Sequence, residues 1–336
     1  DGCPTQQQQI VVKVGSSLSL YSLLLTILQP GDHCLLPLPG FPNYQGALSL
    51  MSCVSVPYLC PPELGYLPSL ETIEQQCTPQ TKCIVVCNPG NPTGATYTKE
   101  LLQSVIRWAH SRDIFVISDE IYAEVTFDEK HSSSALLEDI DGINADMIAI
   151  VSGVPKAYAM SGYRIGWSRS AIPIAEQLTK MQEPIVSCSN SFAQDAATIA
   201  LTAPQECVHE MTAQYRRRRD VALTILAERG RPSAYRPGGA FYLPVNISSS
   251  GMPSREFALK LLSEKRCAVA PGIAFSTMDP YKGDGSDIVS DQQRKEYVSL
   301  LDSFCRISLA NSEENLATGL HLICDLLDEM DRTARD

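Results

Sequence analysis

Long apolar runs and basic residues are both scarce in this sequence of 336 residues. No apolar run reaches the roughly 20 residues that a membrane-spanning helix needs, so we expect no membrane partner. The chain has 27 Lys and Arg against 38 Asp and Glu, which gives a formal net charge of -11. Because an acidic surface repels phosphate backbones, we also expect no nucleic acid partner.

Cysteine spacings typical of metal or disulfide sites are absent as well. The 12 cysteines are scattered, with no CxxC pair and no Cys/His cluster, which argues against a zinc site or a disulfide framework. Several lie inside apolar runs, as Cys83 and Cys87 do. We therefore expect no metal, buried free thiols and a reducing compartment, which favours a cytoplasmic location.

The composition is otherwise that of a globular protein, with 44% hydrophobic and 19% charged residues. Strand-like runs alternate with helical patterns in the first half of the chain. This alternation predicts an α/β fold, with a mostly parallel sheet and helices on both of its faces. The expected strands are residues 10–14, 34–37, 54–57, 83–87, 114–118 and 147–151, and the expected helices are 18–28, 44–51, 70–76 and 98–108.

The second half is mainly helical between residues 173 and 230. A long helix near 209–228 is expected to connect a large domain, residues 1–215, to a small C-terminal α/β domain, residues 216–336. The basic run Arg216–Arg219 within it is interpreted as a solvated or inter-domain helix face.

Two features follow in the C-terminal part. Residues 279–301 are polar and contain Gly and Asp, so we interpret them as a surface insertion. Residues 315–330 have the apolar spacing of an amphipathic helix.

Three polar side chains follow expected strand ends: Asn91, Asp119 and Lys156. Ligands of parallel sheets bind beyond the carboxyl ends of the strands, so we expect these side chains to lie together. A desolvated lysine can be neutral and form a Schiff base with an aldehyde. Read singly, each has a plainer alternative, such as a solvated loop lysine for Lys156 or a helix N-cap for Asp119.

Two further sites are weak when taken alone. Gly15, Ser16 and Ser17 form a small-residue turn between a strand and a helix, where free amides and the helix dipole favour an anion. Many such turns bind nothing. Arg306 lies in the run Phe304–Ala310, where an ordinary ion pair at a strand end is the alternative.

Four motifs nevertheless occur in one order: Asn-Pro-Gly-Asn-Pro-Thr-Gly at 88–94, Ser-Asp-Glu-Ile-Tyr-Ala at 118–123, the lysine segment 152–167, and Phe-Cys-Arg-Ile-Ser-Leu-Ala at 304–310. Together they resemble the class I and II aminotransferases, pyridoxal-phosphate enzymes of fold type I. The resemblance spans most of the chain. It implies a large domain with a seven-stranded sheet and a smaller second domain.

The resemblance implies a role for each matching residue in cofactor chemistry. Lys156 would form the Schiff base with pyridoxal 5'-phosphate and move a proton to and from the substrate Cα. Asp119 would pair with the pyridine nitrogen, which makes the ring an electron sink. Tyr122 and Asn91 would donate hydrogen bonds to the phenolate oxygen of the cofactor.

The same resemblance assigns the contacts that hold the cofactor. The turn Gly15, Ser16 and Ser17 would bind its phosphate together with Arg164, whose guanidinium suits a phosphate, and Phe41 would stack on its ring.

Two candidates concern the phosphate and the substrate. The family often has a serine three residues before the lysine; here Gly153 stands there, and Ser152 is left as an open candidate for that hydroxyl. Arg306, with Asn91, would bind the α-carboxylate of the substrate.

The implied activity is amino transfer from an L-amino acid to a 2-oxo acid by a ping-pong mechanism, in a homodimer. Residues 39–44 look closest to the tyrosine branch and the lysine motif to the aspartate and alanine branch, so aromatic substrates are slightly favoured. Two alternatives stay open. One is a lyase of the same fold, similar to aminocyclopropane-carboxylate synthases or C–S lyases, and the other is a truncated non-catalytic domain.

The amino terminus departs from the family pattern. Family members carry a longer segment before the phosphate turn, whereas this chain begins at Asp1, fourteen residues before Gly15. We expect a fragment that lacks a substrate-gating segment and a tyrosine that reaches the partner subunit, and is therefore catalytically incomplete. An organelle-targeting segment lost from this end is the alternative to a cytoplasmic location.

Overall fold

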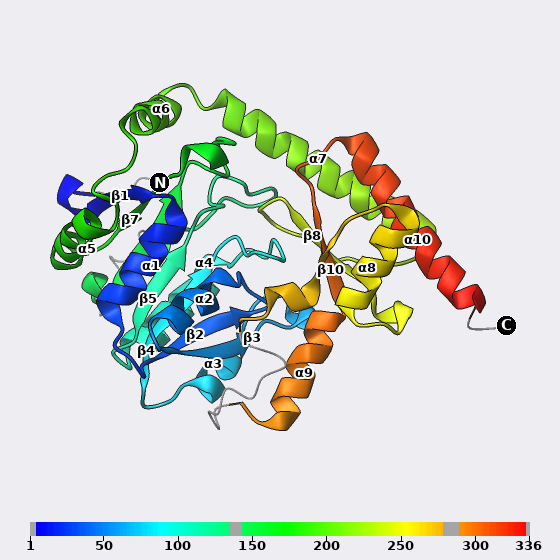
Figure 1. The fold of residues 1–336 in the computed structure, drawn as a ribbon, viewed down its shortest axis with the longest axis horizontal. Helices are drawn as coiled ribbons and strands as arrows, with labels where there is room; N and C mark the ends of the chain where they lie inside the picture. Colours follow the sequence, from blue (N-terminus) through cyan, green and yellow to red (C-terminus); the bar gives the residue numbers. More distant parts are fainter. Residues whose placement is uncertain (1–4, 135–142, 278–288, 334–336) are drawn as a thin grey trace.

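The computed structural model describes residues 5–134, 143–277 and 289–333. Its main body is a seven-stranded sheet flanked by helices (Figure 1). β7 runs antiparallel to both of its neighbours, and the other adjacent strands are parallel. The predicted mostly parallel α/β sheet is therefore confirmed. In spatial order the strands are β1 (Ile10–Val14), β7 (Ile165–Arg169), β6 (Ile148–Gly153), β5 (Phe115–Asp119), β4 (Thr81–Cys87), β2 (His33–Leu38) and β3 (Val54–Leu59).

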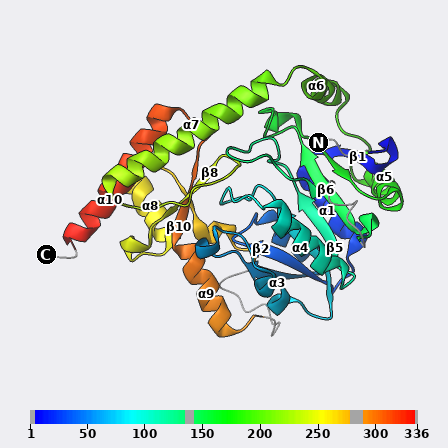
Figure 2. The same ribbon diagram turned by 180° about the vertical axis from the view of Figure 1, so that it is seen from behind.

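Helices cover both faces because the central strands are apolar on both. In β4, Cys83 and Val85 point to one core, whereas Ile84 and Val86 point to the other, as the two-residue period of a strand requires. The first core is closed by α1 (Ser16–Ile27), α2 (Asn43–Leu50) and α5 (Ile172–Val186). The second is closed by α3 (Leu70–Gln76) and α4 (Lys99–His110), which Figure 2 shows in front of the sheet.

The C-terminal part has its own small antiparallel sheet and its own core. The strands are β8 (Tyr242–Asn246), β10 (Phe304–Ser308) and β9 (Ala270–Pro271), and the helices around them include α8 (Ser254–Lys265) and α10 (Glu313–Thr333). The long helix α7 (Glu206–Arg229) runs from α6 (Ser191–Thr202) to α10 (Figure 1). The predicted boundary between residues 215 and 216 falls within α7, and the division at that point stays a prediction.

The basic run on α7 combines a buried and an exposed arginine. Arg219 is fully buried. It donates from Nη1 to Asp128 at 2.5 Å and to the carbonyl of Pro237 at 2.9 Å, and its guanidinium lies over the Phe127 ring. Arg217 is exposed and pairs with Glu313. The inter-domain alternative therefore applies to Arg219, which ties α7 to the chain that follows β5.

The structure describes only part of the stretch 279–301. Residues 279–288 lie outside the described residues. From Asp291 to Asp302 the chain forms α9, whose Tyr297 and Leu301 are buried against Phe275 and Phe304. Most of this polar helix lies at the surface, and two apolar residues four positions apart give it a buried stripe. The interpretation of the stretch as an insertion stays a prediction.

No helix within residues 5–134, 143–277 and 289–333 combines the length and the apolar character that crossing a membrane requires.

We predict that Arg219→Ala lowers the free energy of unfolding by about 3 kcal/mol, because it empties a buried site and removes the buried cation that pairs with Asp128 and Asp220. The matched control on the same helix is Arg217→Ala, whose exposed ion pair should contribute at most about 1 kcal/mol. Urea unfolding of both variants measures the difference. Equal losses would show that burial of Arg219 has no energetic weight.

Candidate active site

A cavity of about 290 Å³ lies where β4, β5 and β6 end. It collects side chains from distant parts of the chain, including Cys87 at the end of β4, Asp119 at the end of β5 and Lys156 just after β6. The cavity therefore lies at the carboxyl edge of the parallel strands, where ligands of such sheets bind. Nine of the residues predicted from the sequence line it: Ser16, Ser17, Phe41, Asn91, Asp119, Tyr122, Lys156, Arg164 and Arg306.

Lys156 is half-buried in this cavity. Burial and the positive charge of Arg164 lower the pKa of its ammonium, although the Asp119 carboxylate opposes this shift. Its Nζ lies 5.9 Å from the centre of the Tyr122 ring. Since the pKa is below that of an ordinary lysine, a larger fraction of this amine is neutral near pH 7. A neutral amine is the form that attacks aldehydes and accepts protons.

Asp119 is a buried carboxylate with a donor on each oxygen. The Tyr44 hydroxyl donates to Oδ2 at 2.7 Å, and the Ile121 amide donates to Oδ1 at 3.2 Å. Burial raises the pKa of this carboxyl, whereas the two hydrogen bonds and the Lys156 charge oppose the rise. A carboxylate held in this way can stabilise a cationic or protonated group that enters the cavity.

Two hydrogen bonds at this cavity join residues that follow strands of the large sheet to residues of the small sheet. The phenol of Tyr122 lies 2.8 Å from that of Tyr242 on β8, and burial raises the Tyr122 pKa well above its ordinary value. Nη1 of Arg306 donates to Oδ1 of Asn91 at 2.9 Å. The cavity therefore closes between the large sheet and the small sheet.

The N-terminus of α1 and Arg164 lie together and make a candidate anion site. Gly15 has φ of 79°, and a Cβ there would lie 2.5 Å from Nη2 of Arg164. A Cβ on Gly166 of β7 would collide with the Ser16 amide. Glycines at both positions thus allow Arg164 and β7 to approach the helix end, where the first amides have no acceptor within the helix.

Arg306 carries an unsatisfied donor. Its guanidinium carbon lies 4.1 Å from the centre of the Tyr242 ring and 4.6 Å from that of Phe275, and burial lowers its pKa. Its Nε is buried and has no hydrogen-bond partner. Because an unpaired buried donor is costly, this atom fits a carboxylate supplied by a ligand.

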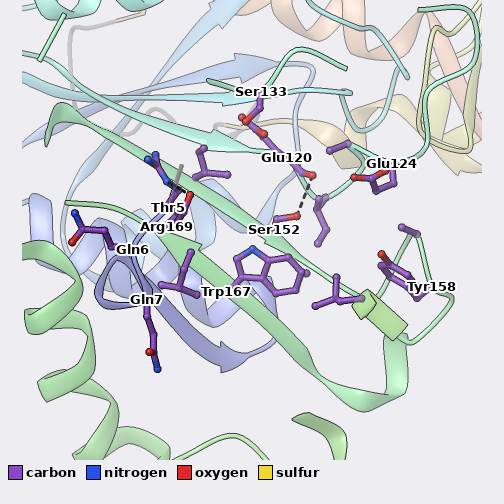
Figure 3. A pocket seen from close by; sticks show the side chains of 17 residues that line it. Thr5, Gln6, Gln7, Glu120, Glu124, Ser133, Ser152, Tyr158, Trp167 and Arg169 are labelled. Carbon is purple, nitrogen blue, oxygen red and sulfur yellow. Dashed lines mark hydrogen bonds between the residues drawn. The ribbon is translucent and has the colours of Figure 1, made fainter. Parts of the chain in front are cut away.

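Ser152 does not line this cavity. Its Oγ donates to the carbonyl of Glu120 at 3.4 Å, and it lines a separate pocket of about 550 Å³ with Tyr158 and Trp167 (Figure 3). The alternation along β6 directs Ser152 to the face opposite Val151, which belongs to the core under α1. We therefore remove Ser152 from the candidate phosphate contacts.

The sequence analysis missed two tyrosines of the cavity. Tyr44 holds Asp119, and Tyr242 stacks on Arg306. A signal for Tyr44 existed, since it lies one helical turn after Phe41 in a motif that was already singled out. For Tyr242 no comparable signal existed, because its position depends on how β8 meets the large sheet.

Residues 2–321 match the family model described as aminotransferase class I and II. The chain belongs to the class I and II aminotransferase family. The predicted resemblance and the predicted activity class are thereby confirmed.

Several aminotransferases whose names give different substrates are similar to this chain. The chain is 30% identical over 274 residues to arginine–pyruvate transaminase AruH of Pseudomonas aeruginosa, covering 82% of this chain and 69% of that protein. It is 30% identical over 330 residues to aspartate/prephenate aminotransferase of Thermus thermophilus, covering 97% and 77%. The structure matches the aromatic aminotransferase from Pyrococcus horikoshii with a TM-score of 0.86 and 29% identity, covering 98% of this chain and 82% of that one.

This family is known for pyridoxal phosphate, and the residues of the cavity fit that group. Such a cofactor needs an amine that is partly neutral, a carboxylate near a ring nitrogen and an anion site for a phosphate. Lys156, Asp119 and the helix end with Arg164 offer these three groups around one cavity. Phe41 lines the same cavity as the candidate aromatic neighbour of the ring.

We predict that reductive labelling of the full chain with pyridoxal phosphate and borohydride modifies Lys156, because its lowered pKa leaves it more neutral and it lines an open cavity. Lys13 is an internal control. Burial also lowers its pKa, but its side chain is fully buried and donates to the carbonyl of Leu178 at 2.6 Å. Peptide mapping measures the result, and a label on another lysine would contradict the assignment.

Proposed function

We propose that this aminotransferase binds pyridoxal 5'-phosphate in the cavity at the ends of β4, β5 and β6 and moves an amino group from an L-amino acid to a 2-oxo acid in two half-reactions. The observation that carries the proposal is the grouping of Lys156, Asp119, Arg164 and Arg306 around one cavity. The chemistry supplied by the bound cofactor is an aldehyde for the amino group and a ring that withdraws electrons from the substrate carbon.

Several residues would hold the cofactor. Ser16 and Ser17, at the N-terminus of α1, and the Arg164 guanidinium would bind its phosphate, since amides, hydroxyls and a fork of N–H groups all suit that anion. Phe41 would cover the ring and exclude water from it. Asn91 and Tyr122 would donate hydrogen bonds to its phenolate oxygen, which is supported by their position in the lining of the cavity.

Three side chains would act on charge and protons. Asp119 would keep a proton on the ring nitrogen by its negative charge, which is strong in a buried site. The Lys156 amine would hold the cofactor covalently and, once released, move a proton at the substrate Cα. Arg306 would bind the α-carboxylate of the amino acid through Nε, which is otherwise unpaired, and through its terminal nitrogens.

The side chain of the amino donor is a separate question. The relatives named above differ in the substrates that their names give, namely arginine, aspartate or prephenate, and aromatic amino acids. In this chain the surroundings of Arg306 are aromatic, with Tyr242 on one side and Phe275 within 4.6 Å. These rings support an aromatic or apolar amino donor.

We propose a homodimer as the working unit. Five exposed apolar side chains lie near the end of α5 and on α6, and we call them the α5–α6 apolar patch: Ile185, Val186, Phe192, Ile199 and Leu201. α6 lies at the edge of the molecule, away from the small domain (Figure 1). Phe192 is 69% exposed and Ile199 is 67% exposed, and clustered exposed apolar side chains mark interfaces. Ile165 packs against Ala193 and Ala197 of α6, so a second copy that covers this patch would lie near the segment that carries Arg164.

We predict that Asp119→Asn preserves folding but lowers the turnover of amino transfer about 10²–10³-fold, because the buried negative charge is lost while the volume is kept. The assay follows the new amino acid formed when an L-amino acid donor and a 2-oxo acid are added to the cofactor-loaded protein. Asp146→Asn, at an exposed site before β6, is the control and should behave as the wild type. Product released over many turnovers without any 2-oxo acid would favour the lyase alternative instead, because amino transfer stops after one equivalent when no acceptor is present.

We predict that the double variant Phe192→Asp, Ile199→Asp is monomeric, because two charges within the α5–α6 apolar patch would be desolvated in a dimer. Sedimentation velocity measures the mass. The control is Leu262→Asp, since Leu262 is exposed on α8 and lies outside the patch. A dimer that survives the double variant would show that another surface makes the contact.

A further inference from the structure

Tyr44 is fully buried, and its hydroxyl contacts the Asp119 carboxylate in the candidate active site. It lies in the first turn of α2, and its O–H donates to Oδ2 of Asp119 at 2.7 Å. The other oxygen, Oδ1, accepts from the Ile121 amide. The two donors come from different elements, so together they determine both the position and the rotation of the carboxylate.

The direction of this hydrogen bond is determined by burial. Burial and the neighbouring Asp119 charge raise the pKa of the Tyr44 phenol well above its ordinary value, so the phenol keeps its proton and donates it. A charge-assisted O–H···O⁻ bond of this length is among the stronger hydrogen bonds in proteins. It opposes the rise in the pKa of Asp119 that burial causes.

The same side chain also contacts the candidate ring-stacking residue. Tyr44 follows Phe41 by three positions, and the two rings pack edge to face with centroids 5.6 Å apart and planes at 85°. Tyr44 thus connects Asp119 to the residue expected to cover the cofactor ring. A shift of α2 would move both contacts together.

We propose that Tyr44 is a positioning residue for amino transfer, whose hydroxyl holds the Asp119 carboxylate ionised and in one orientation toward the cofactor ring. This role rests on the function proposed above for the cavity. Tyr44 acts through Asp119, and removing its hydroxyl alone keeps the ring that packs against Phe41.

The experiment compares Tyr44→Phe with Tyr58→Phe in the full chain. Tyr58 is a matched control, because it is also fully buried and donates to a buried acceptor, the carbonyl of Val85, at 2.8 Å. Each substitution removes one hydroxyl and keeps the ring. Before the cofactor is added, carbon-13 NMR of labelled aspartate follows the titration of Asp119, whose signal is identified by its loss in Asp119→Asn.

We expect Tyr44→Phe to raise the proton affinity of Asp119 about tenfold or more, because burial is then opposed by one donor fewer. The carboxylate consequently protonates at higher pH. After loading, the acid limb of the pH profile of kcat should move to higher pH in the same direction, and kcat should fall more than KM changes. Tyr58→Phe should leave the titration and the acid limb where they are in the wild type.

A second variant, which should shift the Asp119 titration in the opposite direction, distinguishes the proposed role from a folding defect. Incorporating 3-fluorotyrosine at position 44 makes the hydroxyl a stronger donor and should lower the proton affinity of Asp119. Unchanged Asp119 titration in either variant, with amino transfer intact in the wild type, would overturn the role of Tyr44 alone. A wild type that transfers no amino group after loading would overturn the proposed function and this role with it.

Discussion

A negative charge buried at the end of a central strand is the constraint around which this site is arranged. Asp119 is largely removed from water, and burial raises the pKa of its carboxyl. Two donated hydrogen bonds and the positive charge of nearby Lys156 oppose the rise in the pKa of Asp119. They favour the ionised carboxylate, which can pair with a protonated group of a ligand. The same surroundings favour a neutral Lys156 amine. Burial and the positive charge of Arg164 lower the pKa of its ammonium, whereas the Asp119 carboxylate raises it.

The second constraint is that the site is shared between two sheets. Asn91, Asp119 and Lys156 follow strands of the large sheet, whereas Tyr242 and Arg306 come from the small one. The contacts of Arg306 with Asn91 and of Tyr122 with Tyr242 join these halves. Away from the cavity, the buried Arg219 of α7 binds Asp128 and the carbonyl of Pro237. Any change in the angle between the two parts therefore changes the position of the carboxylate-binding arginine relative to the lysine.

Most of the fold could be predicted because its periodicities are local. β1 has the expected bounds Ile10–Val14, and the helix expected after Thr98 begins at Lys99 with the Thr98 side chain as its cap. The same kind of reasoning failed where burial depended on distant partners. The α9 segment is polar overall, and its two buried residues, Tyr297 and Leu301, are buried only because they pack against Phe275 and Phe304. Ser152 has the right residue type near the lysine, but the strand alternation turns it to the other face.

The sequence by itself determined which side chains could do the chemistry and the strand ends that carry them, because parallel strands bring their carboxyl ends to one edge regardless of loop detail. Only the tertiary structure decided what each side chain faces. The partner of Asp119 is the phenol of Tyr44, 75 positions earlier in the chain. The rings around Arg306 come from β8 and from the turn at Phe275. Such contacts depend on how helices and sheets pack in three dimensions, and no local pattern of residues encodes them.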